Sequence, residues 1–247
     1  MPMTGQKFLH GLITPIDPKN IFSMIQAGYA ADFILALTVE SLNGVRNRST
    51  ALSGMREADP DFMRALGLLR EAQLAGGVGV RVDEDKSKGT TAVLFFRRDD
   101  LSPETAAQLA ELRRLLKLAP DQQSFLLTHS PVRGADNELA VNSRSMIQIM
   151  SAFSSYMDVP EEHLQDHSAV RAFESSTAQD GGGRVHIYSG KARPTDAFAA
   201  VAYRGHWYWI NEGDWPSKRA LTAIMFFFTL GETSGDEKLP VLTIPAQ

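Results

Sequence analysis

The spacing of hydrophobic residues changes at Gly76-Gly77, and this change restricts the chain to a mixed fold. Before the two glycines, the stretch that begins with Asp59-Pro60 repeats apolar residues about every 3.6 positions, as a helix does. The aspartate is expected to cap this helix and the proline to occupy its first position. After the glycines, GVGVRVDED and KGTTAVLFFRRDD are typical of an antiparallel hairpin. We therefore expect an α+β fold, mainly an antiparallel sheet with several amphipathic helices packed on it.

The other segments repeat the same two patterns. Apolar spacing predicts further helices over 19–28, 32–42, 102–120 and 143–159, and an apolar helix that Asp214 to Ser217 cap. The helix from Asp32 to Leu42 is expected to stop at Asn43-Gly44, and the polar stretch from Asn47 to Asp59 is expected to form a surface loop. Strands are expected at SFLLTHS, NELAVNS, VHIYSG, DAFAAVAY, HWYWIN and PVLTIP, with Arg204-Gly205 as a tight turn.

The length of the chain suits one large domain. Its 247 residues, 43% of them hydrophobic, are enough to bury a full core. We predict a single α+β domain over 1–247, with two intimately packed halves of about 1–158 and 185–247 as the alternative. The segment 161–184 mixes charges and serines with Gly181-Gly182-Gly183, so a flexible exposed loop is expected to join the halves.

Charge and composition exclude several classes of protein. The net charge is only -4, so nucleic acid is not an expected partner. The absence of cysteine excludes disulfides, thiolate zinc sites, iron–sulfur clusters and thiol nucleophiles. The N-terminal MPMTGQKFLHG does not have the pattern of a signal peptide, and the apolar run from Leu221 to Leu230 is too short to cross a bilayer. We expect membrane contact only through a lipid anchor that this sequence lacks.

No group of residues in the sequence isolates a catalytic, cofactor or metal site. His163 and His167 are four positions apart, which would suit two metal ligands on a helix face, but a short solvated helix is the favoured interpretation. The glycines at 76–79 and 181–183 lead into strands, which does not fit a phosphate-binding loop before a helix. No serine lies in a nucleophile elbow and no carboxylate pair stands out. We therefore expect no cofactor, no metal and no catalytic residue.

The run His206, Trp207, Tyr208 and Trp209 is the most unusual in the chain. In a strand, Trp207 and Trp209 share one face, while His206, Tyr208 and Ile210 share the other. One face is expected to be core. The other face either packs inside the protein, which we favour, or presents an aromatic platform to a ligand, a sugar or a partner protein.

Three cations complete the candidate surface. Arg144, Lys218 and Arg219 lie near expected helix starts, where a positive charge opposes the helix dipole. Each is expected to pair with an acid of the same chain, such as Glu212 or Asp214, and a bound anion or a partner is the alternative. With the four residues of the aromatic run, these cations form the predicted interaction or ligand surface.

Three segments resemble a family of uncharacterised bacterial proteins that are often predicted envelope lipoproteins. They are AGYAADFILALTVESLNGVRNRS, SRSMIQIMSAFSSYMDVP and AYRGHWYWINEGDWPSKRALTAIMFFFTLGE, and the resemblance extends from about Gln6 to VLTIP. It implies a periplasmic or outer-membrane location, because the matching region of that family usually follows a lipoprotein signal. The lipidation cysteine is missing from this sequence. The resemblance implies no reaction and no catalytic residues.

These observations predict a non-catalytic module of the cell envelope, with a structural or assembly role, that binds a partner protein or further copies of itself. The chain is not expected to be an enzyme. The alternative from another class is a small-ligand-binding protein or an enzyme, with a pocket near the strand His206–Ile210 and with Arg144 or Lys218 holding an anion. A cytoplasmic regulator is the alternative for the location.

Overall fold

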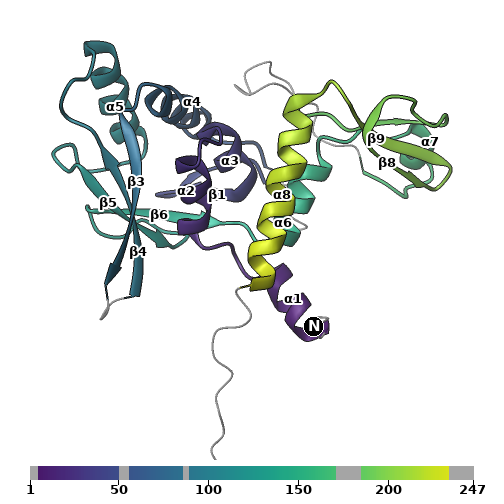
Figure 1. Ribbon diagram of the computed structural model, residues 1–247, viewed down its shortest axis with the longest axis horizontal. Coiled ribbons are helices and arrows are strands. Elements are labelled where there is room, and N and C mark those ends of the chain that lie inside the picture. The colour runs from purple at the N-terminus through teal and green to yellow at the C-terminus, as the bar shows by residue number, and fades with distance from the viewer. Residues whose placement is uncertain (1–4, 50–55, 86–88, 171–184, 234–247) are drawn as a thin grey trace, which may run out of the picture.

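The chain folds into two sheets that are joined by helices. The computed structural model describes residues 5–49, 56–85, 89–170 and 185–233. Figure 1 shows the larger sheet on the left, the smaller sheet on the right, and the long helix α8 (Trp215–Thr233) between them. The combination of helices with mostly antiparallel sheets confirms the predicted α+β fold.

Within the described residues, the larger sheet has six strands in the order β2-β1-β6-β5-β4-β3. Neighbouring strands run antiparallel, except that β5 and β6 are parallel. The hairpin predicted after Gly76-Gly77 is confirmed as β3 and β4, which pair from Val78 opposite Phe96 to Asp85 opposite Gly89. The strands are β1 (Val39–Leu42), β2 (Val45–Arg46), β3 (Val78–Asp85), β4 (Gly89–Phe96), β5 (Ser124–His129) and β6 (Glu138–Ser143).

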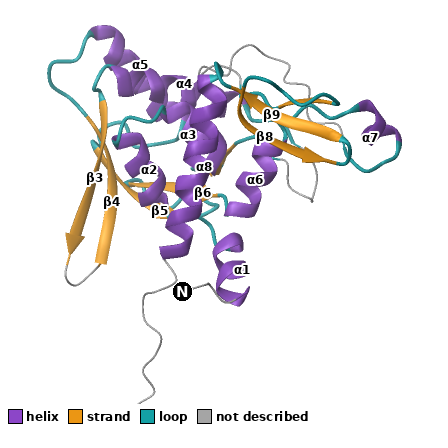
Figure 2. Cartoon of the chain, turned by 45° about the vertical axis from the view of Figure 1, so that its right-hand side comes forward, coloured by secondary structure: helices purple, strands orange, loops and turns teal. Residues whose placement is uncertain are grey.

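Helices pack beside this sheet and supply most of its core. Figure 1 and Figure 2 show α2, α3 and α4 side by side next to the larger sheet. Fully buried phenylalanines come from several elements of this core, among them Phe22, Phe62, Phe125 and Phe227. The helices other than α8 are α1 (Gly5–Ile13), α2 (Pro18–Gln26), α3 (Ala31–Thr38), α4 (Pro60–Leu74), α5 (Pro103–Leu115), α6 (Met146–Ser154) and α7 (Glu161–Gln165).

The helix expected from Asp32 to Leu42 is shorter than predicted. α3 ends at Thr38, and β1 then pairs with β6 on one side and β2 on the other. The β-branched Val39 favours a strand, and pairing with β6 gives its backbone hydrogen-bond partners in a buried ladder. Asn43 and Gly44 do not stop a helix but form the β1–β2 turn, with φ of 47° and 81°, as a type I′ turn requires.

Two expectations about the segment after β2 are corrected. Asn47 is not on the surface: it is 3% exposed, and its Nδ2 donates to the carbonyls of Ala36 (2.8 Å) and Val39 (2.6 Å). Asp59 precedes α4 as predicted, but its side chain does not cap the helix. Its Oδ2 accepts the backbone N–H of Arg46 (2.8 Å) instead, so the carboxylate ties the start of α4 to β2.

In the part of the chain that the structure describes, the smaller sheet has three strands in the order β7-β9-β8. They are β7 (Tyr188–Gly190), β8 (Ala197–Tyr203) and β9 (His206–Asn211). The Arg204-Gly205 turn is confirmed, with φ of 49° and 78°. The expected loop 161–184 is partly helical, because α7 occupies its start. The rest of that loop from residue 171, and the expected strand PVLTIP, lie outside the described residues.

Helix α8 connects the two sheets. It begins as predicted, because the N–H of Ser217 donates to Asp214 Oδ1 (3.1 Å). Near its start, Leu221 packs against the core of the smaller sheet, and further along Ile224 and Phe227 belong to the core of the larger one. Phe153 of α6 contacts both cores. The α8 and α6 helices therefore hold the two sheets together, and the division of the chain into two halves stays a prediction.

Candidate functional site

The two faces of β9 differ as the alternation of its residues predicts. His206, Tyr208 and Ile210 are buried, at 7%, 8% and 4% exposed. Trp207 and Trp209 are half-buried on the opposite face. The face with Tyr208 packs toward α7 and α6, so it forms the small core. The candidate site therefore has two surfaces to consider, one beneath the sheet and one on its outer side.

Beneath the sheet, two histidines and a tyrosine lie together. The hydroxyl of Tyr208 and Nδ1 of His163 share a hydrogen bond at 3.2 Å. The ring of His206 meets that of His163 edge-on, with 5.0 Å between centroids. Burial is the main cause that raises the pKa of Tyr208, and the nearby Tyr203 adds to it. These groups come from α7 and β9, and sequence reasoning considered His163 only as a partner of His167.

A cavity of about 460 Å³ opens beside this cluster. Its walls come from the segment before α7, from α7 itself and from the β8–β9 hairpin. Met157, Val159, Pro160 and Val201 make the lining largely apolar, with Tyr208 and His163 as polar groups inside it. A mainly apolar hollow with a few polar groups is typical of a site for a small molecule or for an inserted side chain.

The outer face of the sheet carries aromatic rings over small residues. Trp209 stacks on Tyr188 with 5.8 Å between ring centroids, and its Nε1 donates to Asn211 Oδ1 (2.8 Å). The guanidinium of Arg193 lies 5.4 Å from the ring centroid of Trp207. Both tryptophans are thus held by residues of the same chain, which fits the structural interpretation that we favour for this face.

The most exposed apolar side chains of this sheet belong to its edge strand. In β8, Phe198, Val201 and Tyr203 are 46%, 61% and 60% exposed. Trp215, at the start of α8, is 70% exposed. Sequence reasoning missed Trp215 and these three residues of β8, whose pattern resembles that of any half-buried strand. The sequence signal that could have indicated an exposed apolar edge strand is the absence of charged residues from AFAAVAY.

The predicted cations do not form one surface. Lys218 pairs with Glu212, as the sequence predicted. Its Nζ also lies 4.8 Å from the ring centroid of Phe198 and 5.2 Å from that of Trp215. Arg219 is exposed, and its positive charge partly opposes the increase in the pKa of Asp32 that burial causes. Of the three cations, Lys218 is the one whose charge lies beside the exposed aromatic residues.

Arg144 lies in the interior, so its assignment to the surface is corrected. Its side chain is 3% exposed, and its Nε donates to Glu40 Oε1 at 2.6 Å. Its Nη1 donates to the carbonyls of Ala36 (3.1 Å) and Leu37 (3.0 Å), and Nη2 donates to the carbonyl of Arg48. These carbonyls include the C-terminal end of α3, where the helix dipole favours a cation. The side chain therefore faces the end of α3, and not the start of α6.

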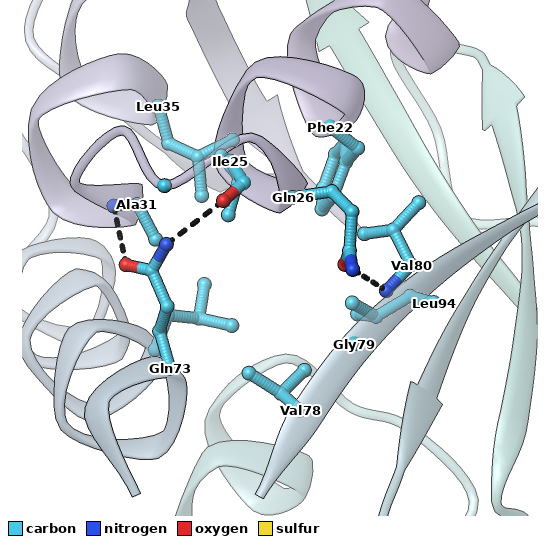
Figure 3. A pocket seen from close by; sticks show the side chains of 12 residues that line it. Phe22, Ile25, Gln26, Ala31, Leu35, Gln73, Val78, Gly79, Val80 and Leu94 are labelled. Carbon is cyan, nitrogen blue, oxygen red and sulfur yellow. Dashed lines mark hydrogen bonds between the residues drawn. The ribbon is translucent and has the colours of Figure 1, made fainter. Parts of the chain in front are cut away.

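A second cavity, of about 270 Å³, lies between α2, α3, α4 and β3 (Figure 3). Gln73 points into it, but its amide is used by the protein, since Oε1 accepts the N–H of Ala31 (3.1 Å) and Nε2 donates to the carbonyl of Ile25 (3.0 Å). Gln26 Oε1 accepts the N–H of Val80 (3.1 Å). The polar groups of this cavity therefore fix the packing of the helices on β3.

Asp32 is a buried carboxyl group near the start of α3. It is 8% exposed, and its Oδ1 has no hydrogen-bond partner among the described residues. Burial raises the pKa of Asp32, while the N–H of Phe33 and the charge of Arg70 partly oppose this increase. The folded protein therefore takes up a proton at Asp32 more readily than the unfolded chain does.

We expect Asp32→Asn to stabilise the protein at about pH 7 and to change little below pH 3.8. The unfolded chain ionises Asp32 at its ordinary pKa of 3.8, whereas the folded protein ionises it only at a higher pH. Ionisation of Asp32 therefore lowers the free energy of unfolding as the pH rises above 3.8. The asparagine amide does not ionise, so the variant does not lose this stability. Urea unfolding of both proteins across this pH range measures the difference. A destabilised variant at neutral pH would contradict the expectation.

We expect Tyr208→Phe to lower the free energy of unfolding by about 1 kcal/mol. The substitution keeps the buried ring but removes the hydroxyl that bonds His163 Nδ1. Tyr203→Phe is the matched control, because Tyr203 is 60% exposed, and we expect its effect to stay within about 0.5 kcal/mol. Chemical denaturation measures both, and equal effects would show that the Tyr208–His163 bond contributes nothing.

Metal ligation is not supported by the described geometry. His167 lies beyond the end of α7 with φ of 57°, so it does not share a helix face with His163. In the described part of the chain, no three His, Cys, Asp or Glu residues gather where they would hold a metal ion.

The chain was compared with family models, curated proteins and solved structures, and none of them matches it. The resemblance to envelope lipoproteins therefore stays a prediction. Among the helices of the described segments, none has both the length and the apolar character that crossing a bilayer requires.

Proposed function

We propose that the protein is a non-catalytic interaction module that binds protein through its smaller sheet. The observation that carries this proposal is the exposure of Phe198, Val201 and Tyr203 along the edge strand β8. Exposed apolar and aromatic residues grouped on one element are typical of a protein-binding surface. The exposed Trp215 extends the same surface beyond Phe198, because Lys218 Nζ lies close to both rings.

The location of this module is a second part of the proposal. We place it in the cell envelope, in the periplasm or at the outer membrane, on the resemblance of its three segments to envelope lipoproteins. An assembly role fits a chain without a recognisable reactive motif. Fractionation of cells that make the protein measures the location, and recovery in the cytoplasmic fraction alone would overturn it.

Site-specific crosslinking tests the binding surface. A photoreactive amino acid replaces Val201 in one variant and Leu74 in another, and both variants are expressed in the native host. Both positions are exposed, at 61% and 71%, but Leu74 lies at the end of α4, in the helices of the larger sheet. We expect a discrete protein adduct from position 201 that is absent at position 74 and is lost when Phe198→Lys is added. No adduct at position 201, or equal adducts at both positions, would overturn the proposed function.

A second candidate function rests on the cavity of about 460 Å³ beside His163 and Tyr208. This cavity would suit a small, mainly apolar ligand with one polar group that reaches the Tyr208–His163 pair. A thermal-shift screen with metals, nucleotides, sugars and apolar compounds tests it. Ala169 lines the cavity, so Ala169→Phe would fill it and should abolish any stabilisation. A shift that survives this substitution would exclude the cavity as the binding site.

A further inference from the structure

The cavity of about 460 Å³ continues the inner face of the smaller sheet. Val201 of β8 lies directly opposite Tyr208 of β9, so the two side chains share one face of the sheet. Tyr208 belongs to the small core and is 8% exposed, whereas Val201 is 61% exposed. Both residues line the cavity, which therefore lies where this face passes from core to solvent. An apolar molecule in the cavity would remove Val201 from water, which is favourable.

The charged residues that line the cavity do not require a charged ligand. Asp158 Oδ2 lies 2.9 Å from His186 Nε2, so this carboxylate has a hydrogen-bond partner in the same chain. Arg204 is exposed in the β8–β9 turn. Hydrogen bonds from Ser168 lower the pKa of Asp166, and the charge of Arg204 adds to this decrease. Arg204 therefore already acts on an acid of the same chain.

The surroundings of Tyr208 disfavour negative charge. Burial is the main cause that raises the pKa of its hydroxyl, and the nearby Tyr203 adds to it. The same loss of hydration penalises a carboxylate placed beside this hydroxyl, because the side chains of Met157, Val159 and Pro160 offer it no hydrogen bonds. The polar end of a ligand in this cavity is therefore expected to be uncharged.

The Tyr208–His163 pair keeps one donor and one acceptor for a ligand. If the Tyr208 hydroxyl donates to His163 Nδ1, then Nε2–H remains as a donor and the Tyr208 oxygen as an acceptor. If Nδ1–H donates instead, the Tyr208 O–H remains as a donor and Nε2 as an acceptor. Among the described residues, these side-chain atoms make no other hydrogen bond. In either tautomer the pair thus complements a group that both donates and accepts, as a hydroxyl does.

We propose that the cavity binds an uncharged, mainly apolar molecule with one hydroxyl group, an alcohol or a phenol, which donates to and accepts from the Tyr208–His163 pair. This inference rests on the second candidate function and names its ligand class. The apolar body of the ligand lies against Met157, Val159 and Val201, and its hydroxyl completes the hydrogen bonds of the pair.

Three probes of similar size test the polar group. n-Octanol donates and accepts, its isomer heptyl methyl ether only accepts, and octanoate is charged. We expect octanol to bind at least about fivefold tighter than the ether, the effect of roughly one hydrogen bond, and at least about tenfold tighter than octanoate. Isothermal titration calorimetry measures the three dissociation constants. A preference for octanol below these factors would overturn the proposed ligand class.

Three variants test where octanol binds. We expect Tyr208→Phe to reduce the preference for octanol over the ether to less than about twofold, because the two ring nitrogens of His163 point apart and cannot both bond one hydroxyl. Tyr29→Phe is the matched control, since Tyr29 packs against the core of the larger sheet, and it should keep the preference. Ala169→Phe should abolish the binding of both probes. Circular dichroism verifies folding, and a preference that survives in folded Tyr208→Phe would overturn the role of the pair.

The outcomes separate this ligand class from the functions proposed above. If the probes bind without a preference for octanol and Ala169→Phe abolishes their binding, a ligand-binding cavity is retained and the hydroxyl class is overturned. Absence of binding by all three probes would overturn both the ligand class and the second candidate function. The crosslinked adduct at position 201 tests the protein-binding function independently of these measurements.

Discussion

Arg144→Met is expected to lower the free energy of unfolding by about 3–5 kcal/mol, because it breaks a buried ion pair by removing one partner. The Glu40 side chain, 17% exposed, would lose its 2.6 Å contact with Arg144 Nε and keep the longer one to Arg56, whose Nη2 is 3.9 Å away. The carbonyl of Leu37 at the end of α3 would also lose the hydrogen bond from Nη1, while the carbonyl of Ala36 would keep Asn47 Nδ2 as a donor. Guanidinium denaturation followed by circular dichroism measures the loss.

Two further variants show whether the uncompensated charge causes this loss. Adding Glu40→Met to Arg144→Met removes the buried carboxylate and should recover part of the stability, although the Leu37 carbonyl still lacks its hydrogen bond from Arg144. Arg64→Met is the surface control, because Arg64 pairs with Glu111 at 2.8 Å on the exposed side of α4. We expect only a small shift from this control. A comparable loss from Arg64→Met and Arg144→Met would contradict a special role for the buried pair.

The fold could be predicted where local signals agreed with the final structure. The helix at Pro60 begins with a proline at its first position, the β3–β4 hairpin follows Gly76-Gly77, and the Arg204-Gly205 turn contains a glycine, which adopts positive φ without strain. The strand at Val39 could not be predicted, because its apolar residues also suit the end of a helix. Its partner β6 lies about a hundred residues further along the chain, and only that pairing decides the conformation.

The candidate site was predictable in part. Alternation along His206–Asn211 correctly separated the buried Tyr208 from the half-buried tryptophans. The burial of Arg144 depends on Glu40 and on the end of α3, neither of which is near it in the sequence. The exposure of Val201 depends on β8 lying at the sheet edge, which the strand order decides. Side-chain chemistry therefore indicated which residues matter, and tertiary contacts decided whether they face solvent.

Phe227→Ala should lower the free energy of unfolding by about 3–5 kcal/mol, the usual range for removing a buried phenylalanine. Phe227 is 0% exposed and lies in the core of the larger sheet, to which it anchors the part of α8 that follows Leu221. Phe226→Ala is the matched control on the adjacent position, 44% exposed, and we expect a loss of less than about 1 kcal/mol. Chemical denaturation measures both.

The same pair of variants tests whether the packing of α8 on the larger core affects protein binding at β8. Hydrogen exchange should increase in α8 of Phe227→Ala, because the cavity weakens its packing on the large core. The smaller sheet keeps its own contacts through Leu221, so the crosslinked adduct expected from position 201 should persist wherever this variant remains folded. Loss of this adduct in folded Phe227→Ala, with Phe226→Ala unaffected, would show instead that the proposed binding surface depends on the packing of α8 against the core of the larger sheet.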